Sequence, residues 1–351
     1  MIILTTGLLV IIVLVIIITV VLIYAIPSKE NLKIDFGDKS SGLHLMNTIL
    51  VSKLPLAVQQ EVKVPIKILK DLALPKSFDC RERWPGLISA PLNQGRCGSC
   101  WAFSTTTSAS DRLRIATNGK VLNTPIVYDL YTNPSQPPEE VHTIDTLSPY
   151  HLAACNNCDI LMRMGKSAMA KWMSDVGECN KECNGGIIPY AYHFISKIGL
   201  TAMSCEYKAG RKEKYICEPD ITCPVYKGKT GVPEQDVFQL VGVDSIKKSL
   251  MLYGPVTVGF TVYQSFETFY KDPKNAKKAY PPVEQIKDGS WKDTVLGGHA
   301  VVCLAWDEDE NGKEFWIIRN SWGSLHWGDG GYFRMYVGET GLEDDCYEIM
   351  M

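Results

Sequence analysis

The amino-acid sequence predicts an α+β protein with a helical first half and a β-rich second half, after an apolar N-terminal segment. Residues 100–117 and 187–198 carry apolar side chains at helical spacing, and a glycine stop signal follows each stretch. After about residue 237 the pattern changes to short strands. We expect these strands at residues 255–262, 299–306, 314–320 and 331–337.

Two connecting segments have distinct signals. The dipeptide Asn311-Gly312 between the second and third expected strands is typical of a tight β-hairpin turn. Residues 120–147 are rich in Pro, Thr and Asn, so we expect a surface loop there.

Composition is ordinary for a globular protein. Of the 351 residues, 46% are hydrophobic and 21% are charged, and the formal net charge is −3. Because no strong excess of basic residues is present, nucleic acid is not expected as a partner.

The N-terminal apolar run extends from Ile2 to Tyr24. A helix needs about 20 apolar residues to cross a bilayer, and this run is long enough. No Lys or Arg precedes it, and the residues that follow form a poor signal-peptidase site. We therefore expect residues 1–26 to be an uncleaved transmembrane anchor rather than a signal peptide.

Orientation in the membrane is indicated by two conflicting features. Lys29, Lys33 and Lys39 follow the apolar run, which by the positive-inside rule would place the remainder in the cytosol. Twelve cysteines favour an oxidising compartment instead. Giving the cysteines more weight, we expect a single-pass protein whose C-terminal bulk is lumenal or extracytoplasmic.

The character of the chain changes near residue 76. Residues 27–75 lack Cys and include 45–51, a candidate short helix. From 76 onward Cys, Trp, Gly and aromatic residues become frequent. The candidate functional residues all lie in this second part.

The strongest motif is the run Asn93-Gln94-Gly95-Arg96-Cys97-Gly98-Ser99-Cys100-Trp101. Cys100 lies where a glycine-containing loop meets the start of a helix, and the partial positive charge of a helix start favours the nucleophilic thiolate. The backbone N–H of Cys100 and the side-chain amide of Gln94 are suitable donors for an oxyanion.

Two other interpretations of Cys97-x-x-Cys100 were weighed. A redox dithiol would follow a strand of a βαβ unit, and none is evident. Half of a zinc site would fit the spacing, with the pair Cys155/Cys158 or Cys179/Cys183 as the other half. Neither accounts for Gln94 or Trp101, so a nucleophile is favoured and no metal is expected.

A thiol nucleophile needs a histidine base, and His299 is the best candidate among six histidines. It enters an apolar strand, and the neighbouring strand ends at Asn320, whose carbonyl oxygen can accept a hydrogen bond from one imidazole nitrogen. Trp322 could shield that bond from water. His326 is the rival base but falls in a loop. His151 and His193 are expected to be ordinary residues.

The segments around Gln94, Cys100, His299 and Asn320 resemble the four catalytic segments of papain-like cysteine proteases, and residues 74–85 resemble the start of a mature cathepsin B-like enzyme. The resemblance implies a two-lobed fold over residues 76–351. The helical lobe would cover about 76–230 and the β-barrel-like lobe about 231–346, with the active-site cleft between them. Residues 27–75 would be a propeptide that occupies the cleft.

The resemblance also implies substrate-binding positions. Cys183-Asn184-Gly185-Gly186 resembles the family's CNGG segment, whose glycine backbone pairs with extended substrate. It also implies substrate contacts for Gly298 and Trp322. We expect protein or peptide substrates, a monomeric catalytic domain and no cofactor. We also expect that processing can release the catalytic domain from the membrane into a lysosome-like compartment.

Three departures from the family pattern are visible. Cys100 and His299 are 199 residues apart, against roughly 130–150 in the family, and insertions near 118–147 and 263–295 account for the excess. The segment from Asn320 to Trp327 carries one residue more than the family pattern. The stretch 205–223, which corresponds to the occluding loop of cathepsin B, contains no His. We therefore expect endopeptidase action rather than removal of C-terminal dipeptides.

Disulfide partners are implied by the resemblance for two pairs, Cys97–Cys183 and Cys155–Cys205. Cys158–Cys179 and Cys217–Cys223 are plausible local bridges. Cys303 is expected to be a buried thiol, and the roles of Cys80 and Cys346 stay open. The alternative to an enzyme is a membrane-displayed binding protein that keeps the protease fold without activity.

Overall fold

The computed structural model describes residues 32–35, 49–131, 139–155, 157–175, 183–208, 217, 222–325 and 327–351. The expected membrane anchor, residues 1–26, lies outside them. Among the residues described, no helix is both long and apolar enough to cross a bilayer.

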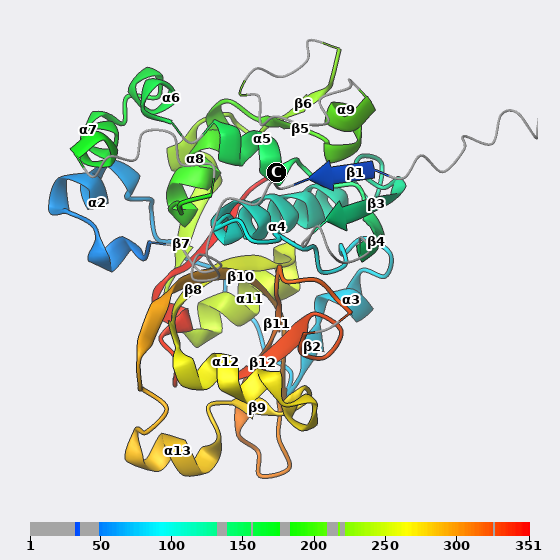
Figure 1. The fold of residues 1–351 in the computed structure, drawn as a ribbon, viewed down its shortest axis with the longest axis vertical. Helices are drawn as coiled ribbons and strands as arrows, with labels where there is room; N and C mark the ends of the chain where they lie inside the picture. Colours follow the sequence, from blue (N-terminus) through cyan, green and yellow to red (C-terminus); the bar gives the residue numbers. More distant parts are fainter. Residues whose placement is uncertain are drawn as a thin grey trace, which may run out of the picture.

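The chain folds into a helical lobe and a β-rich lobe (Figure 1). The helices between Cys100 and Lys208 gather on one side of the molecule. They are α4 (Cys100–Ala116), α5 (Pro149–Ala154), α6 (Cys158–Arg163), α7 (Ser167–Asp175), α8 (Ile188–Lys197) and α9 (Met203–Lys208). A short antiparallel pair of strands, β5 (Leu200–Thr201) and β6 (Val225–Tyr226), lies beside α9. The predicted α+β class is confirmed.

The β-rich lobe is built on an eight-stranded sheet with the order β7-β13-β8-β10-β11-β12-β9, and β2 also pairs with β10. Its strands are β2 (Phe78–Asp79), β7 (Val237–Leu240), β8 (Val256–Tyr263), β9 (Ala279–Tyr280), β10 (Val295–Glu308), β11 (Glu314–Arg319), β12 (Tyr332–Tyr336) and β13 (Cys346–Ile349). The central neighbours β8, β10, β11 and β12 pair antiparallel. The four strands expected from the sequence are confirmed, and Gly312 adopts φ +77° in the predicted turn.

Short helices connect and flank this sheet. They are α3 (Cys80–Arg83), α10 (Pro233–Asp236), α11 (Val243–Tyr253), α12 (Gln264–Lys271), α13 (Val283–Asp288) and the 3₁₀ turns η2 (Pro273–Asn275) and η3 (Leu342–Asp344). The expected insertion at 263–295 forms α12, η2, β9 and α13. Its Phe266 and Tyr270 pack against Trp327 and Phe333, so the insertion thickens the core of the β lobe.

Helix α4 lies between the two lobes and is buried along nearly its whole length. Its polar residues are tolerated because their hydroxyls bond to carbonyls one turn earlier, as Thr106 does to Ala102 (2.7 Å) and Thr107 to Phe103 (2.7 Å). The helix ends at the expected signal, where Asn118 and Gly119 take the left-handed conformation at φ 51° and 72°.

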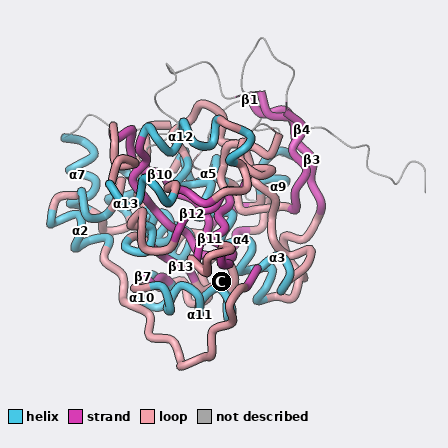
Figure 2. The backbone as a smooth tube through the Cα atoms, turned by 90° about the horizontal axis from the view of Figure 1, so that it is seen from below, coloured by secondary structure: helices cyan, strands magenta, loops and turns pink. Residues whose placement is uncertain are grey.

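The surface loop expected at 120–147 is instead a hairpin of β3 (Pro125–Tyr131) and β4 (Glu139–Ile144). The run Ile126-Val127-Tyr128 has high strand propensity, and the Pro, Thr and Asn residues lie mainly outside it. β1 (Leu32–Asp35) pairs parallel with β3. This small sheet lies apart from the large one in both views (Figure 1, Figure 2).

Residues 49–75 run over the outside of both lobes. The expected helix at 45–51 is wrong for its described part, because the chain is extended at Leu50 and a 3₁₀ turn, η1 (Val51–Lys53), begins only afterwards. Helix α2 (Leu56–Val62) follows and lies beside α7 (Figure 1, Figure 2). Residues 65–67 then reach the edge strand β7.

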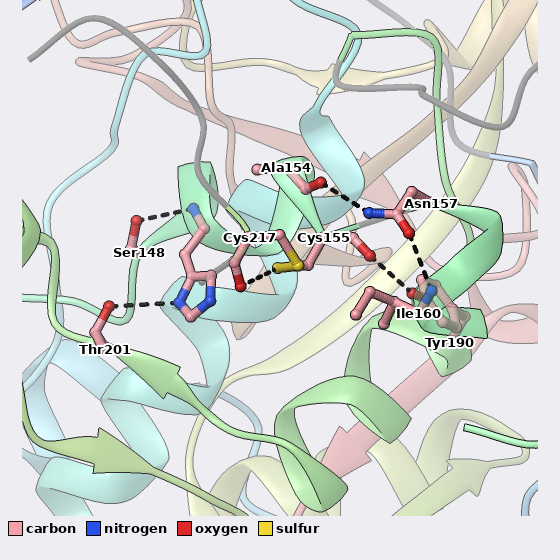
Figure 3. Close-up of a disulfide and its surroundings, with 9 residues drawn as sticks. Ser148, Ala154, Cys155, Asn157, Ile160, Tyr190, Thr201 and Cys217 are labelled. Carbon is pink, nitrogen blue, oxygen red and sulfur yellow. Dashed lines mark hydrogen bonds between the residues drawn. A yellow bond between two sulfur atoms is a disulfide. The ribbon is translucent and has the colours of Figure 1, made fainter. Parts of the chain in front are cut away.

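The disulfides agree only partly with the expected pairs. Cys97–Cys183 is confirmed. Cys155 pairs with Cys217, not Cys205 (Figure 3), and Cys205 pairs with Cys223. Spacing does not determine connectivity, and here α9 places Cys205 next to Cys223. Cys158 is disulfide-bonded, and its expected partner Cys179 lies outside the described residues.

Candidate active site

The loop before α4 is fixed to the turn that contains Gly185 and Gly186. The disulfide Cys97–Cys183 joins the two, and the Gly98 N–H donates to the Cys183 carbonyl at 2.9 Å. Cys100 begins α4, is fully buried, and takes no part in a disulfide. Its sulfur therefore lies at the start of a seventeen-residue helix, where the helix dipole favours a thiolate.

Gln94 connects this loop to the other lobe. Its backbone N–H donates to the Ser321 carbonyl at 2.8 Å, and its Oε1 accepts from the Ser321 hydroxyl at 2.5 Å. Its Nε2 donates to the Cys97 carbonyl at 2.8 Å. Both the oxygen and the nitrogen of the Gln94 amide are thereby held in place at the contact between the loop before α4 and Ser321 of the β lobe.

His299 and Asn320 meet across neighbouring strands. His299 lies on β10, and Asn320 directly follows β11, which pairs with β10. The His299 Nε2 and the Asn320 Oδ1 are 2.8 Å apart. With Nε2 donating, the ring is the tautomer whose Nδ1 is an acceptor, and this buried Nδ1 has no hydrogen-bond partner among the residues that the structure describes. The Asn320 contact thus fixes the orientation of the ring and leaves Nδ1 as its second hydrogen-bonding atom.

The imidazole of His299 is enclosed by aromatic rings. Trp322 stacks on it with ring centroids 4.7 Å apart and an interplanar angle of 23°. Phe260 meets its edge at 5.9 Å, and Trp327 stands perpendicular to Trp322 at 5.0 Å. These rings keep water from the His299–Asn320 hydrogen bond and so strengthen it.

The candidate substrate-binding glycines lie on both sides of this site. A Cβ at Gly186 would come within 2.3 Å of the Trp101 ring, so only glycine fits. The Gly186 carbonyl accepts from the Ile49 N–H at 3.0 Å, and Gly185 takes φ 106°. Gly298 precedes His299 on β10, opposite Thr261.

A model of the family described as papain family cysteine protease matches residues 74–125 and 157–349. The chain belongs to this family.

Several similar proteins carry cathepsin B-like names. Over 301 residues the protease is 30% identical to cathepsin B-like cysteine proteinase 4 of Caenorhabditis elegans, covering 81% of this chain and 77% of the relative. Over 279 residues it is 29% identical to cathepsin B-like CP2 of Giardia intestinalis, covering 78% and 73%. The expected membership in the cathepsin B-like branch is confirmed.

Solved structures show the same fold. The structure titled proCathepsin B S9 from Trypanosoma congolense superposes with a TM-score of 0.60 at 21% identity, covering 88% of this chain and 87% of that one. A digestive procathepsin L 3 of Tenebrio molitor gives a TM-score of 0.53 at 20% identity, covering 88% and 77%. The papain-like fold of the protease is therefore confirmed.

The two competing interpretations of Cys97-x-x-Cys100 do not fit the protease. Cys97 is bonded to Cys183 rather than to Cys100, which excludes the redox pair. Because Cys97 and Cys183 are bonded to each other, neither can be a zinc ligand. Cys155 and Cys158 are also in disulfides. The rival base His326 lies outside the described residues.

Sequence reasoning missed two parts of the site. Ser321, which orients Gln94, had no signal beyond its position after Asn320. Phe260 could have been found from strand pairing, because it faces His299 in the β8–β10 register. His151 and His193, which were expected to be ordinary surface or core residues, are both buried, and burial lowers the pKa of His193 to about 3.

Proposed function

We propose that the protein is a cysteine endopeptidase in which Cys100 is the nucleophile and His299 the acid–base residue. The supporting observation is the imidazole of His299, held through Nε2 by Asn320 at 2.8 Å while the buried Nδ1 stays open. That nitrogen is the one that would exchange a proton with Cys100.

The reaction follows from these roles. Nδ1 takes the thiol proton, and the Cys100 sulfur attacks the peptide carbonyl carbon. The oxyanion accepts hydrogen bonds from the Cys100 N–H and the Gln94 amide. The imidazolium of His299 then protonates the leaving amine as the C–N bond breaks, which leaves a thioester. Water, deprotonated by His299, attacks the thioester, and the carboxylic acid and the thiol are released.

Residues 27–75 are proposed to be a propeptide. The Ile49 N–H already bonds to the Gly186 carbonyl, where an extended substrate backbone would bind. The Glu61 carboxylate accepts from the N–H groups of Ala168 (2.8 Å) and Met169 (2.9 Å), which caps α7. These contacts hold the segment against the catalytic domain and keep the enzyme inactive until it is cut.

Endopeptidase action is proposed from the region of residues 205–223. The Cys205–Cys223 disulfide joins two positions that are eighteen residues apart in the sequence, and residues 205–223 contain no histidine to bind a substrate C-terminus. An extended polypeptide could then continue past the cleft. Efficient release of C-terminal dipeptides by the activated enzyme would contradict this specificity.

The location is proposed to be extracytoplasmic, because disulfides persist in oxidising compartments. Three are described in full, and Cys158 belongs to another. Residues 1–26 would anchor the chain in the membrane until processing releases the catalytic domain. Protection of the folded domain from added protease in intact vesicles would test this orientation.

The function is tested by active-site labelling. After activation, a vinyl sulfone or epoxide with a peptide handle is expected to attach to Cys100, and Cys100→Ala is expected to lose both labelling and peptidase activity. Cys303→Ser is the matched control, because Cys303 is a buried thiol outside the site. If the folded, activated protein were neither labelled nor active, the alternative of an inactive binding protein would replace the proposal.

A further inference from the structure

Glu348 on β13 is a fully buried carboxylate with three partners. Arg112 of α4 donates to it at 2.9 Å, and the Ser249 hydroxyl and the Lys67 ammonium also bond to it. Arg112 lies twelve residues along α4 from Cys100, or roughly 18 Å at the helical rise. Glu348 therefore lies at the far end of α4 from the nucleophile.

Lys67 reaches Glu348 through an aromatic pocket. Its Nζ lies 4.1 Å from the ring centroid of Tyr253 and 4.9 Å from that of Phe238. The Met350 sulfur is 3.0 Å from the same nitrogen. The Lys67 ammonium thus meets one buried carboxylate and two aromatic faces, which is the chemistry that selects an ammonium group.

The backbone around Lys67 is bound as well. Its N–H donates to the Gln239 carbonyl at 3.0 Å, and the Gln239 N–H donates to the Pro65 carbonyl at 3.0 Å. Ile66 pairs parallel with Gln239 on β7, the terminal strand of the large sheet. The segment thus adds a short strand to the sheet edge, a common mode of peptide recognition.

Burial changes abruptly after this strand. The Lys67 side chain is only 12% exposed, whereas Ile68 is 94% exposed. Residues 70–73 are also exposed and form no helix or strand. Recognition is therefore concentrated at Lys67, and the chain beyond it is open to cleavage.

We propose that Glu348, Tyr253 and Phe238 form a lysine-binding site at the far end of α4, which accepts the lysine of an extended strand added to β7. In this chain the resident ligand is Lys67. The site anchors residues 65–67 so that a cut in the exposed loop after them leaves the strand bound. The proposal rests on the proposed function only in regarding residues 49–75 as a segment that is cut.

The pocket chemistry is tested by rescue in the full chain carrying Cys100→Ala, which cannot process itself. Lys67→Ala is expected to lower Tm by about 4 °C or more, because it removes one partner of a buried ion pair. Millimolar n-butylammonium should restore part of the loss, whereas n-butanol should not. Lys70→Ala, at an exposed lysine in the same segment, should leave Tm unchanged.

Equal Tm values for Lys67→Ala and Lys70→Ala, or equal rescue by butanol and butylammonium, would overturn the lysine site. If Lys67→Ala does not fold, Lys67→Met keeps the side-chain stem and its Tm is compared with Lys70→Met instead.

Anchoring is tested by cutting the chain after Lys67. A recognition site for a sequence-specific protease is inserted between Ala73 and Leu74 of the Cys100→Ala chain, and the cut protein is passed through native gel filtration. We expect the N-terminal fragment to co-elute with the catalytic domain. In Lys67→Ala its dissociation constant should rise at least 10-fold over Lys70→Ala, and equal constants would overturn the anchoring role. Neither experiment needs peptidase activity, so failure of the proposed function leaves both results interpretable.

Discussion

Asp111 and Arg319 form a buried ion pair, with 2.9 Å between the Asp111 Oδ2 and the Arg319 Nη1. Asp111 lies on α4, the helix that begins at Cys100, and Arg319 is the last residue of β11, directly before Asn320. The pair thus fixes the strand end next to Asn320 to the helix that carries Cys100, the proposed nucleophile. Both side chains are at most 2% exposed.

The first prediction concerns this pair. Asp111→Asn is expected to destabilise the fold by about 3–5 kcal/mol, because it leaves the Arg319 and Arg114 guanidinium groups buried without their carboxylate. Urea denaturation measures the loss. Asp175→Asn breaks an exposed ion pair with Lys171 and should cost about 0–1 kcal/mol. Similar losses in the two variants would refute the role of the buried pair.

The second prediction concerns Trp322, whose ring stacks on the imidazole of His299, the proposed acid–base residue. Trp322→Ala exposes the His299–Asn320 hydrogen bond to water, and kcat/KM is expected to fall about 10-fold. Trp322→Phe keeps a ring over His299 and should recover most of the activity. Steady-state assays on a peptide substrate give the comparison, with Leu325→Ala, at an exposed side chain nearby, as the control. Equal activity of the Ala and Phe variants would argue against shielding.

The third prediction concerns the cap that Glu61 makes on α7. Glu61→Gln removes the negative charge from the start of α7. The binding of α2 to α7 should therefore weaken by about 1 kcal/mol. The rate at which a thiol reagent labels Cys100 in the uncut chain should therefore rise about 5-fold. Gln60→Ala, at the exposed neighbour, should not change it. An unchanged rate in Glu61→Gln would mean that the cap contributes nothing to closure.

The fourth prediction concerns Asp345, whose carboxyl is buried beside Val51 and Tyr347. Burial raises its pKa from 3.8 to about 6. Between these values the folded protein keeps a proton that the unfolded chain has released, so this group makes stability fall as the pH rises through that window. Asp345→Asn stays neutral and is expected to be more stable than the parent above about pH 7, with the difference shrinking toward pH 4.

Thermal unfolding across this pH range provides the measurement for Asp345. Asp307→Asn, at an exposed position on β10, should show no such trend. A stability difference between Asp345→Asn and the parent that is the same at both ends of the range would contradict the assigned cause.

Local signals explain what the sequence could predict. The length of α4 follows from its glycine boundary, and the contact between His299 and Asn320 follows from two strands joined by a short hairpin. In each case the determining residues lie close together in the chain. The same holds for Cys303, expected to be a buried thiol and found fully buried in β10.

Tertiary contacts explain what it could not predict. The pairing of Cys155 with Cys217 joins positions 62 residues apart, and no local pattern indicates it. The β3–β4 hairpin was hidden by the turn-forming residues around Ile126-Val127-Tyr128. The docking of α2 on α7 requires a carboxylate at Glu61 to meet a helix start more than one hundred residues later, and no spacing rule indicates that.

The hydrogen bonds of Gln94 and its neighbours join the two lobes next to Cys100. Residues 92–94 bond to 321–323 through the Gln94–Ser321 and Gly323–Leu92 backbone hydrogen bonds, so this loop is attached to the β lobe although its sequence leads into α4. The Gln94 amide also donates to the Cys97 carbonyl at 2.8 Å, so this one side chain is bonded both to the loop that leads into α4 and to Ser321 of the β lobe. Any motion that separated the lobes would have to stretch one of these hydrogen bonds beside Cys100, so the position of the Gln94 amide would report on how far the lobes have opened.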